Sequence, residues 1–108
     1  MIRLTVLYGH PQNTADFEAY YHNHHMPLAS KMKGLKGFTV GMVQSAEPGQ
    51  QAPYYRVASL YADTSEELQA IMSSPEAQAA VADIQNFATG GVTIFVSNEE
   101  VVIPVQIR

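Results

Sequence analysis

The stretch IRLTVLYGHPQNTADFEAYYHNHHMP, residues 2–27, decides the fold of this chain. Its first seven residues alternate between two sets of side chains, which is the period of a β-strand, and Gly9-His10-Pro11 interrupts that strand. Asn13 can cap a helix, and Pro27 is expected to end this helix one or two residues before itself. Spacings of three and four residues predict one shared helix face for Phe17, Tyr20, Tyr21, His24 and His25. The stretch therefore predicts a strand followed by a helix with an aromatic, histidine-rich side.

The rest of the chain adds the same two kinds of element in a definite order. Alternation predicts strands over residues 36–46, 54–62 and 92–96. A capping box at Thr64 starts one helix, and Ser74-Pro75 starts another, whose apolar stripe is Ala77, Val81, Ile84 and Ala88. The order strand, helix, strand, strand, helix, strand indicates an α+β protein of the ferredoxin-like βαββαβ type, with one antiparallel four-stranded sheet and its helices on one face.

The second face of this sheet still carries apolar residues such as Leu7 and Phe95. Because the chain has no third layer, we expect the sheet of a second copy to cover this face, giving a homodimer and a dimeric α/β barrel. Residues 1–97 form the domain in this interpretation. Residues 98–108 form an apolar C-terminal extension, which is expected to be an edge strand or a dimer contact.

Composition narrows the classes of function. The chain has 108 residues, enough for one domain, and a net charge of −4 without a basic run, which argues against nucleic acids and anionic membrane surfaces as partners. No apolar run reaches the roughly 20 residues that a membrane-spanning helix needs. Cysteine is absent, which removes disulfides and thiolate chemistry and suggests a cytoplasmic protein.

Three of the four histidines lie close together, at His22, His24 and His25. A dedicated metal site is not expected, because adjacent histidines point in different directions and no nearby carboxylate completes a ligand set. The helix dipole explains a solvated His22 near a helix end. His25 shares a face with Tyr21 and precedes a proline turn, so it can line a cleft and act as a general acid or base. The alternative is a buried histidine that hydrogen-bonds a backbone carbonyl.

Arg56 is a charge inside an otherwise apolar strand, and three interpretations are open. It can pair with a carboxylate, anchor an anionic substrate, or lie on a sheet edge. Several aromatic side chains can line an apolar pocket between sheet and helices, although most strand aromatics are simply core. These are Tyr8, Phe38, Tyr54, Tyr55, Tyr61 and Phe87.

Several segments together resemble the EthD family, named for a protein of ethyl tert-butyl ether degradation operons. They are residues 8–11 (YGHP), 17–21 (FEAYY), 25–29 (HMPLA), 31–35 (KMKGL), 73–76 (SSPE) and 87–92 (FATGGV). The resemblance implies a dimeric α+β barrel and selects His25 through the family's His-x-Pro motif, but not His22 or His24. Family members accompany oxidative degradation systems, and relatives with the same barrel include cofactor-free monooxygenases, lactone isomerases and haem-dependent enzymes.

These observations lead to two hypotheses of function, and they leave open whether the protein is an enzyme. The first is a small-molecule enzyme, or an accessory protein to one, in oxidative catabolism, with a hydrophobic ligand near His25 and with Tyr21 and Arg56 in support. The second is a non-catalytic dimeric carrier of a hydrophobic metabolite. No cofactor is expected. A haem-binding protein with His24 or His25 as axial ligand is a third alternative.

Overall fold

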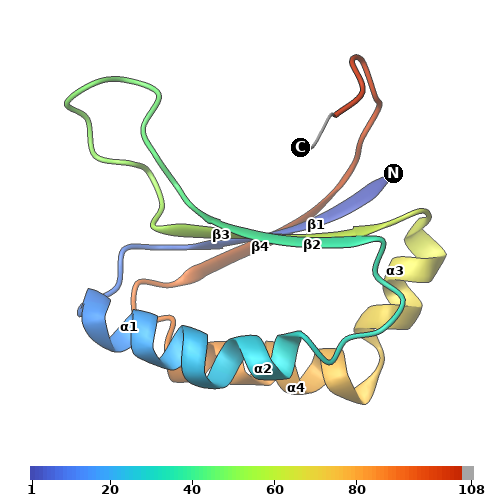
Figure 1. Cartoon of the computed structure of the whole chain (residues 1–108), viewed down its shortest axis with the longest axis horizontal. Helices are drawn as coiled ribbons and strands as arrows, with labels where there is room; N and C mark the ends of the chain where they lie inside the picture. Colours follow the sequence, from blue (N-terminus) through green and yellow to red (C-terminus); the bar gives the residue numbers. More distant parts are fainter. Residues whose placement is uncertain (106–108) are drawn as a thin grey trace.

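The computed structural model describes residues 1–105 of the chain as one layer of sheet covered by one layer of helices (Figure 1). In chain order the elements are β1 (Ile2–Tyr8), α1 (Thr14–Tyr20), a π-helical turn (Tyr21–His25), α2 (Met26–Ala29), β2 (Gly37–Met42), β3 (Arg56–Ala62), α3 (Ser65–Met72), α4 (Pro75–Asp83), a 3-10 turn (Ile84–Asn86) and β4 (Val92–Asn98).

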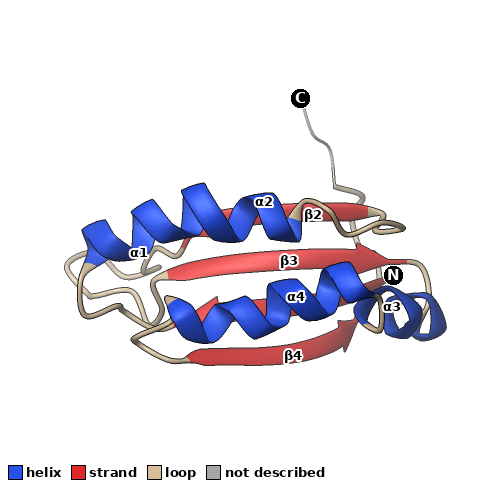
Figure 2. Ribbon diagram, turned by 90° about the horizontal axis from the view of Figure 1, so that it is seen from below, coloured by secondary structure: helices blue, strands red, loops and turns tan. Residues whose placement is uncertain are grey.

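The four strands form one antiparallel sheet in the order β2-β3-β1-β4, and all helices lie on one of its faces (Figure 2). The ferredoxin-like α+β fold expected from the sequence is thereby confirmed. Strand β2 is shorter than the expected 36–46 and β3 begins at Arg56 rather than at residue 54. Both differences arise where the chain leaves the sheet for the long loop 43–55, and the Val43 N–H still donates to the Tyr55 carbonyl at 3.1 Å just beyond the two strand ends.

The hydrophobic core lies between the sheet and the helices. Alternate residues of β1 and β3 face the helices, as their period predicts: Ile2, Leu4, Val6, Tyr8, Arg56, Ala58, Leu60 and Ala62. They pack against buried side chains of the helical layer, namely Phe17, Tyr21, Leu68, Ile71, Ile84 and Phe87. Burial of this continuous apolar face is the main stabilising term for a small domain.

The helix does not end before Pro27, as its sequence suggests, but continues through it. Between Tyr21 and His25 the helix widens into a π turn, in which the Met26 N–H donates to the Tyr21 carbonyl. Pro27 then occupies the first turn of α2, where its missing N–H costs little. Segments α1 and α2 consequently form one rod that runs along the sheet (Figure 2), and His25 lies in the π turn between them.

The π turn also changes the helix face predicted from α-helical spacing. Phe17, Tyr21 and His25 are buried as expected, but His24 is exposed and Tyr20 is only partly buried. The tilted contact between the His24 and Tyr20 rings, with 4.9 Å between their centroids, therefore lies toward the outer side of the rod. Tyr20 precedes the π turn, so the wider turn affects only the residues that follow it, including His24.

The opposite face of the sheet carries no helix, and two segments rise beside it (Figure 1). The loop 43–55 rises at one end and the chain after β4 at the other. The last contacts of that chain with the sheet are the Glu99 N–H to Met1 carbonyl bond, 2.8 Å, and the Arg3–Glu99 ion pair, 3.0 Å. Residues 101–105 are exposed and form no strand with this sheet, and the rest of the expected C-terminal extension, residues 106–108, lies outside the described residues.

Within residues 1–105 no helix is long and apolar enough to cross a membrane.

Candidate functional site

His25 is held beneath the sheet by a carboxylate from the second half of the chain. Its Nδ1 lies 3.0 Å from Oδ2 of Asp83, the last residue of α4. The His25 residue is only 5% exposed. The Tyr20 hydroxyl donates to Asp83 Oδ1 at 2.6 Å, and the Asn86 amide donates to the same oxygen at 3.0 Å. Asp83 therefore accepts from three donors, as a buried carboxylate requires.

The protonation states of this pair follow from burial and hydrogen bonding. Burial lowers the pKa of His25, and the hydrogen bond and charge of Asp83 offset only part of this effect. Burial alone would raise the pKa of Asp83, but the bonds from Tyr20, Asn86 and His25 outweigh it, so the pKa is lowered. At neutral pH Asp83 is ionised and His25 is neutral. Because a carboxylate can only accept, Nδ1 carries the proton and Nε2 keeps a free lone pair.

Two aromatic rings fix the plane of the His25 imidazole. Tyr21 stacks on it at a centroid distance of 5.6 Å and an interplanar angle of 28°. Phe87, which follows the 3-10 turn, lies 4.6 Å away on a tilted plane. With Asp83 on Nδ1 and rings packed against the imidazole, the orientation of Nε2 is set before any ligand arrives.

A cavity of about 210 Å³ lies beside His25, between the sheet and the helices. Nearly all of its walls are aliphatic, aromatic or methionine side chains, from β1, β2, β3, β4, α2, α3 and α4. Its lining residues are Leu4, Val6, Tyr8, Tyr21, His25, Met26, Ala29, Met32, Phe38, Ala58, Leu60, Met72, Ala77, Ala80, Val81, Ile84 and Ile94. A dry apolar cavity of roughly 150 Å³ can hold benzene, so this one has room for a substituted aromatic ring.

Arg56 lies in the same region of the core but does not line the cavity. Its Nη2 donates to Glu18 Oε1 at 2.7 Å, and its guanidinium lies 4.6 Å from the centroid of the Tyr21 ring. Burial raises the pKa of Glu18, but the hydrogen bond and charge of Arg56 outweigh that effect, so the pKa is lowered. Pairing with a carboxylate is thus the observed state among the three interpretations that the sequence left open.

The three residues proposed from the sequence are brought together in one row. Arg56 lies over the Tyr21 ring, and Tyr21 stacks on His25. The Tyr21 side chain is fully buried, its hydroxyl has no hydrogen-bond partner among residues 1–105, and burial raises its pKa to about 12, so it stays protonated. Of the six aromatics suggested as pocket lining, Tyr8 and Phe38 line the cavity, whereas Tyr61 lies on the other face of the sheet beside Arg3.

The other histidines have separate surroundings. His10 Nε2 lies 2.7 Å from the Ala52 carbonyl, and His22 Nε2 lies 3.5 Å from Glu18 Oε1 at the surface. Over residues 1–105 no three His, Cys, Asp or Glu side chains are placed to hold a metal ion. The histidine cluster in the sequence is therefore not a cluster around a common point.

Sequence reasoning missed Asp83, Tyr20 in its bonding role, and Asn86. Asp83 could have been identified from its position on the buried face of α4, where a carboxylate is unusual. The stripe predicted for that helix included Val81, which is 45% exposed, while Ala80 and Asp83 are buried. A helix phase shifted by one residue would have placed Asp83 inside, where an acid needs a partner.

These features define a ferredoxin-like α+β protein with a buried histidine–aspartate pair beside an apolar cavity. The EthD domain matches residues 10–91, most of the chain and all of the histidine–aspartate site. The chain belongs to the EthD family.

Individual proteins agree with this assignment. An uncharacterized 11.0 kDa protein of the thcB–thcC intergenic region of Rhodococcus erythropolis is 38% identical over 104 residues, which cover 96% of this chain and 100% of that protein. An ethyl tert-butyl ether (EthD) family protein from Bacillus halodurans has 30% identity and a TM-score of 0.84, with 93% of this chain and 99% of that chain covered. A dimeric ferredoxin-like protein of unknown function from Thermobifida fusca, 18% identical with a TM-score of 0.65 over 89% of this chain and 88% of its own, has a similar fold.

Replacement of Asp83 by asparagine tests the electrostatics of the site. We expect the Asp83→Asn variant to lower the pKa of His25 further, because it removes the charge that partly offsets burial. We also expect the free energy of unfolding to fall by about 1–3 kcal/mol, since His25 Nδ1–H loses its charged acceptor. NMR titration of the imidazole C–H resonances and urea denaturation measure the two effects.

The control for this experiment is Asp16→Asn, which changes an exposed acid in the first turn of α1. It should leave the His25 titration as it is in the wild type. A His25 pKa that rises or stays constant in Asp83→Asn contradicts the assigned pair.

Proposed function

We propose that this protein is a small-molecule enzyme, or an accessory protein to one, in oxidative catabolism, and that it binds a hydrophobic ligand in the cavity beside His25. The observation that carries the proposal is a neutral, pre-oriented imidazole at the wall of a 210 Å³ apolar cavity. A structural histidine would need no such cavity, and an inert cavity would need no ionised partner for its histidine. Membership of a family named for ethyl tert-butyl ether supports the catabolic part. A cytoplasmic location belongs to the same proposal.

In this proposal His25 accepts a proton from the ligand. Nε2 takes the proton, the bond from hydrogen to the ligand's carbon or oxygen breaks, and the electron pair stays on the ligand. Asp83 stabilises the imidazolium that forms, because its carboxylate already accepts the Nδ1 proton. Tyr21 lines the same cavity and keeps its proton, so its hydroxyl is assigned as a donor to a ligand oxygen. Arg56 supports Tyr21 from outside the cavity.

The walls limit the ligand to an uncharged, compact and mostly apolar compound. A charged group would lose its hydration in this cavity without a matching partner, which costs several kcal/mol. A compound with one hydrogen-bond donor or acidic hydrogen satisfies Nε2 and leaves the remaining walls in apolar contact.

Binding of phenol and toluene, which have nearly the same shape, tests the role of Nε2. We expect the preference for phenol over toluene to fall about two- to tenfold in His25→Phe, because the variant loses one net hydrogen bond. His24→Phe, which changes the adjacent exposed histidine, should keep the wild-type preference. Calorimetric or NMR titration gives both dissociation constants.

The same preference should depend on pH in the unmodified protein. The pKa of His25 is lowered from its ordinary 6.5, so the lone pair is available at pH 7 and is lost as the pH falls through the lowered pKa. Phenol affinity should decrease in that range while toluene affinity changes little. Equal pH profiles for the two ligands would falsify the assignment of Nε2 as acceptor.

Exchange of the acidic C–H hydrogens of 2-indanone with D₂O separates an enzyme from a carrier. A general base commonly contributes about a hundredfold or more, so wild type should accelerate exchange and His25→Gln should lose about that factor. Glutamine can still donate to Asp83 but cannot act as the base. Tyr21→Phe should retain part of the rate. The exchange is followed by NMR.

The outcome that favours the alternative is equally definite. Binding of 2-indanone with no acceleration beyond that of free imidazole at the same concentration identifies a dimeric carrier of a hydrophobic metabolite.

We further propose a homodimer in which the open sheet faces pack together. That face carries Leu7, Val57, Tyr61 and Phe95, and the similar protein from Thermobifida fusca is described as dimeric. The loop 43–55 and the exposed residues 101–105 flank the same face, where both can contact a second copy (Figure 1). The dimer-contact role of the C-terminal extension belongs to this proposal.

Two residues of β4 that face opposite sides of the sheet test the dimer. Phe95 and Val92 have similar exposure, 45% and 41%, but Phe95 lies on the open face and Val92 on the helix side. Phe95→Glu should halve the mass measured by light scattering at micromolar concentration, and Val92→Glu should leave the dimer intact. A wild-type monomer at that concentration overturns this arrangement.

A further inference from the structure

A second hollow, of about 460 Å³, lies outside the cavity between α2 and the edge strand β2. Its walls come from α2, from part of the connection that follows α2 and from β2: Met26, Ala29, Ser30, Met32, Gly34, Leu35, Lys36, Gly37, Phe38 and Val40. This outer groove is wider and more polar at its rim, where Ser30 and Lys36 are found. It is more open to solvent than the cavity beside His25, which is itself partly open where Val81 and Ile94 are each 45% exposed.

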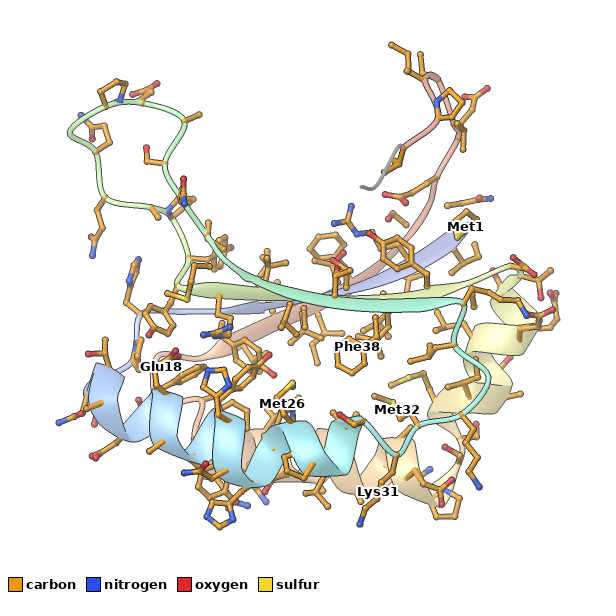
Figure 3. The ribbon with its side chains drawn as sticks, viewed as in Figure 1. Met1, Glu18, Met26, Lys31, Met32 and Phe38 are labelled. Atoms are coloured by element: carbon orange, nitrogen blue, oxygen red, sulfur yellow. The ribbon has the colours of Figure 1, made fainter. Side chains whose placement is uncertain are left out.

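The groove and the cavity share four wall residues, Met26, Ala29, Met32 and Phe38. Side chains that face two adjoining hollows form the partition between them. In Figure 3 Phe38 points from the sheet toward the helices, and Met26 and Met32 point from the helical layer toward the sheet, while Lys31 points away. The partition therefore consists of three large side chains that meet from opposite sides, above the small buried Ala29.

These side chains can change shape at little cost. Methionine is unbranched and has three rotatable bonds, so it adapts to its surroundings without leaving a favoured rotamer. Met26, Met32 and Phe38 are also only partly buried, which leaves them space to move toward the groove. None of the three offers a hydrogen bond to a passing charge or to its hydration water.

The connection that carries Met32 is loosely attached at its centre. The Met32 N–H donates to the Ala29 carbonyl at 3.2 Å, and the Lys36 N–H donates to the Tyr61 carbonyl at 2.8 Å. Between these anchors Lys33, Gly34 and Leu35 make no backbone hydrogen bond to the rest of residues 1–105. Segments with few backbone bonds open at low free-energy cost. Gly34, at φ +92°, lets the chain turn here.

We infer that the groove between α2 and β2 is the entrance to the His25 cavity, and that Met26, Met32 and Phe38 are its gate. The gate admits flat or narrow uncharged apolar molecules and rejects charged ones before they reach Nε2. This inference rests on the proposed function, since it takes the cavity to be a ligand site. Met72 also lines the cavity but not the groove, so it provides a matched comparison.

Indole is a suitable probe, because the chain contains no tryptophan and gives no indole fluorescence of its own. Stopped-flow fluorescence of indole with the whole protein yields association and dissociation rates. We expect Met32→Ala to raise both rates about tenfold, since a passage that must open limits association, and to change the dissociation constant by less than about threefold. Met72→Ala should alter the dissociation constant and leave the association rate close to wild type.

A milder variant, Met32→Leu, covers the case in which Met32→Ala does not fold, and it should slow both rates because a branched side chain is stiffer. Equal association rates in wild type and in the Met32 and Met72 variants would overturn the entrance while leaving the ligand site intact. Absence of indole and phenol binding to the wild type would overturn the ligand site and the entrance together.

Discussion

The hydrogen bond between His25 and Asp83 is the interaction on which the site depends. It joins two residues that are 58 positions apart, one in the rod of α1 and α2 and one at the end of α4. A bond to a charged group contributes roughly 1.5–3 kcal/mol, and removal of either partner exposes the other to the full cost of burial. Tyr20 and Asn86 donate the remaining hydrogen bonds to Asp83, and these bonds offset the cost of burying its carboxylate between the helices and the sheet. A hydrogen bond to a charged group therefore joins the two halves of the helical layer, in addition to their apolar packing.

Two consecutive tyrosines of the first helical rod support the His25–Asp83 bond in different ways. Tyr20, on the outer side, satisfies the carboxylate, and Tyr21, on the inner side, packs against the imidazole. Consecutive residues can do this because they point about 100° apart on a helix. Arg56 extends the inner row, with its charge balanced by Glu18 rather than by a ligand. The charged groups of the core are thus paired with each other, and His25 also lines the apolar cavity.

Local rules predicted the architecture well, because each strand and helix carries its own signals. The alternation in β1 and β3 separated the two faces of each strand correctly, but it did not show which face of β3 is core, and Tyr61, proposed for the pocket, lies on the open face. The side chains of Asn13, Thr64 and Ser74 cap their helices as expected. The histidine that matters was also identifiable, from its neighbours and from the family resemblance. Its partner was not, because the contact with Asp83 depends on how two helices pack over the sheet. The π turn was missed for a similar reason: proline signals the end of an α-helical bond pattern but not what replaces it.

The π turn also limits how the chain can vary in length. Each residue added to or removed from a helix rotates everything beyond it by about 100°. The five residues from Tyr21 to His25 contain one more than an α-helical turn can accommodate, and the Met26 bond to Tyr21 closes over that extra residue. A single deletion here would restore regular spacing and turn either the imidazole or the α2 side chains away from the core. The number of residues between Tyr21 and Pro27 is consequently fixed by the geometry of the site, independently of which side chains these positions carry.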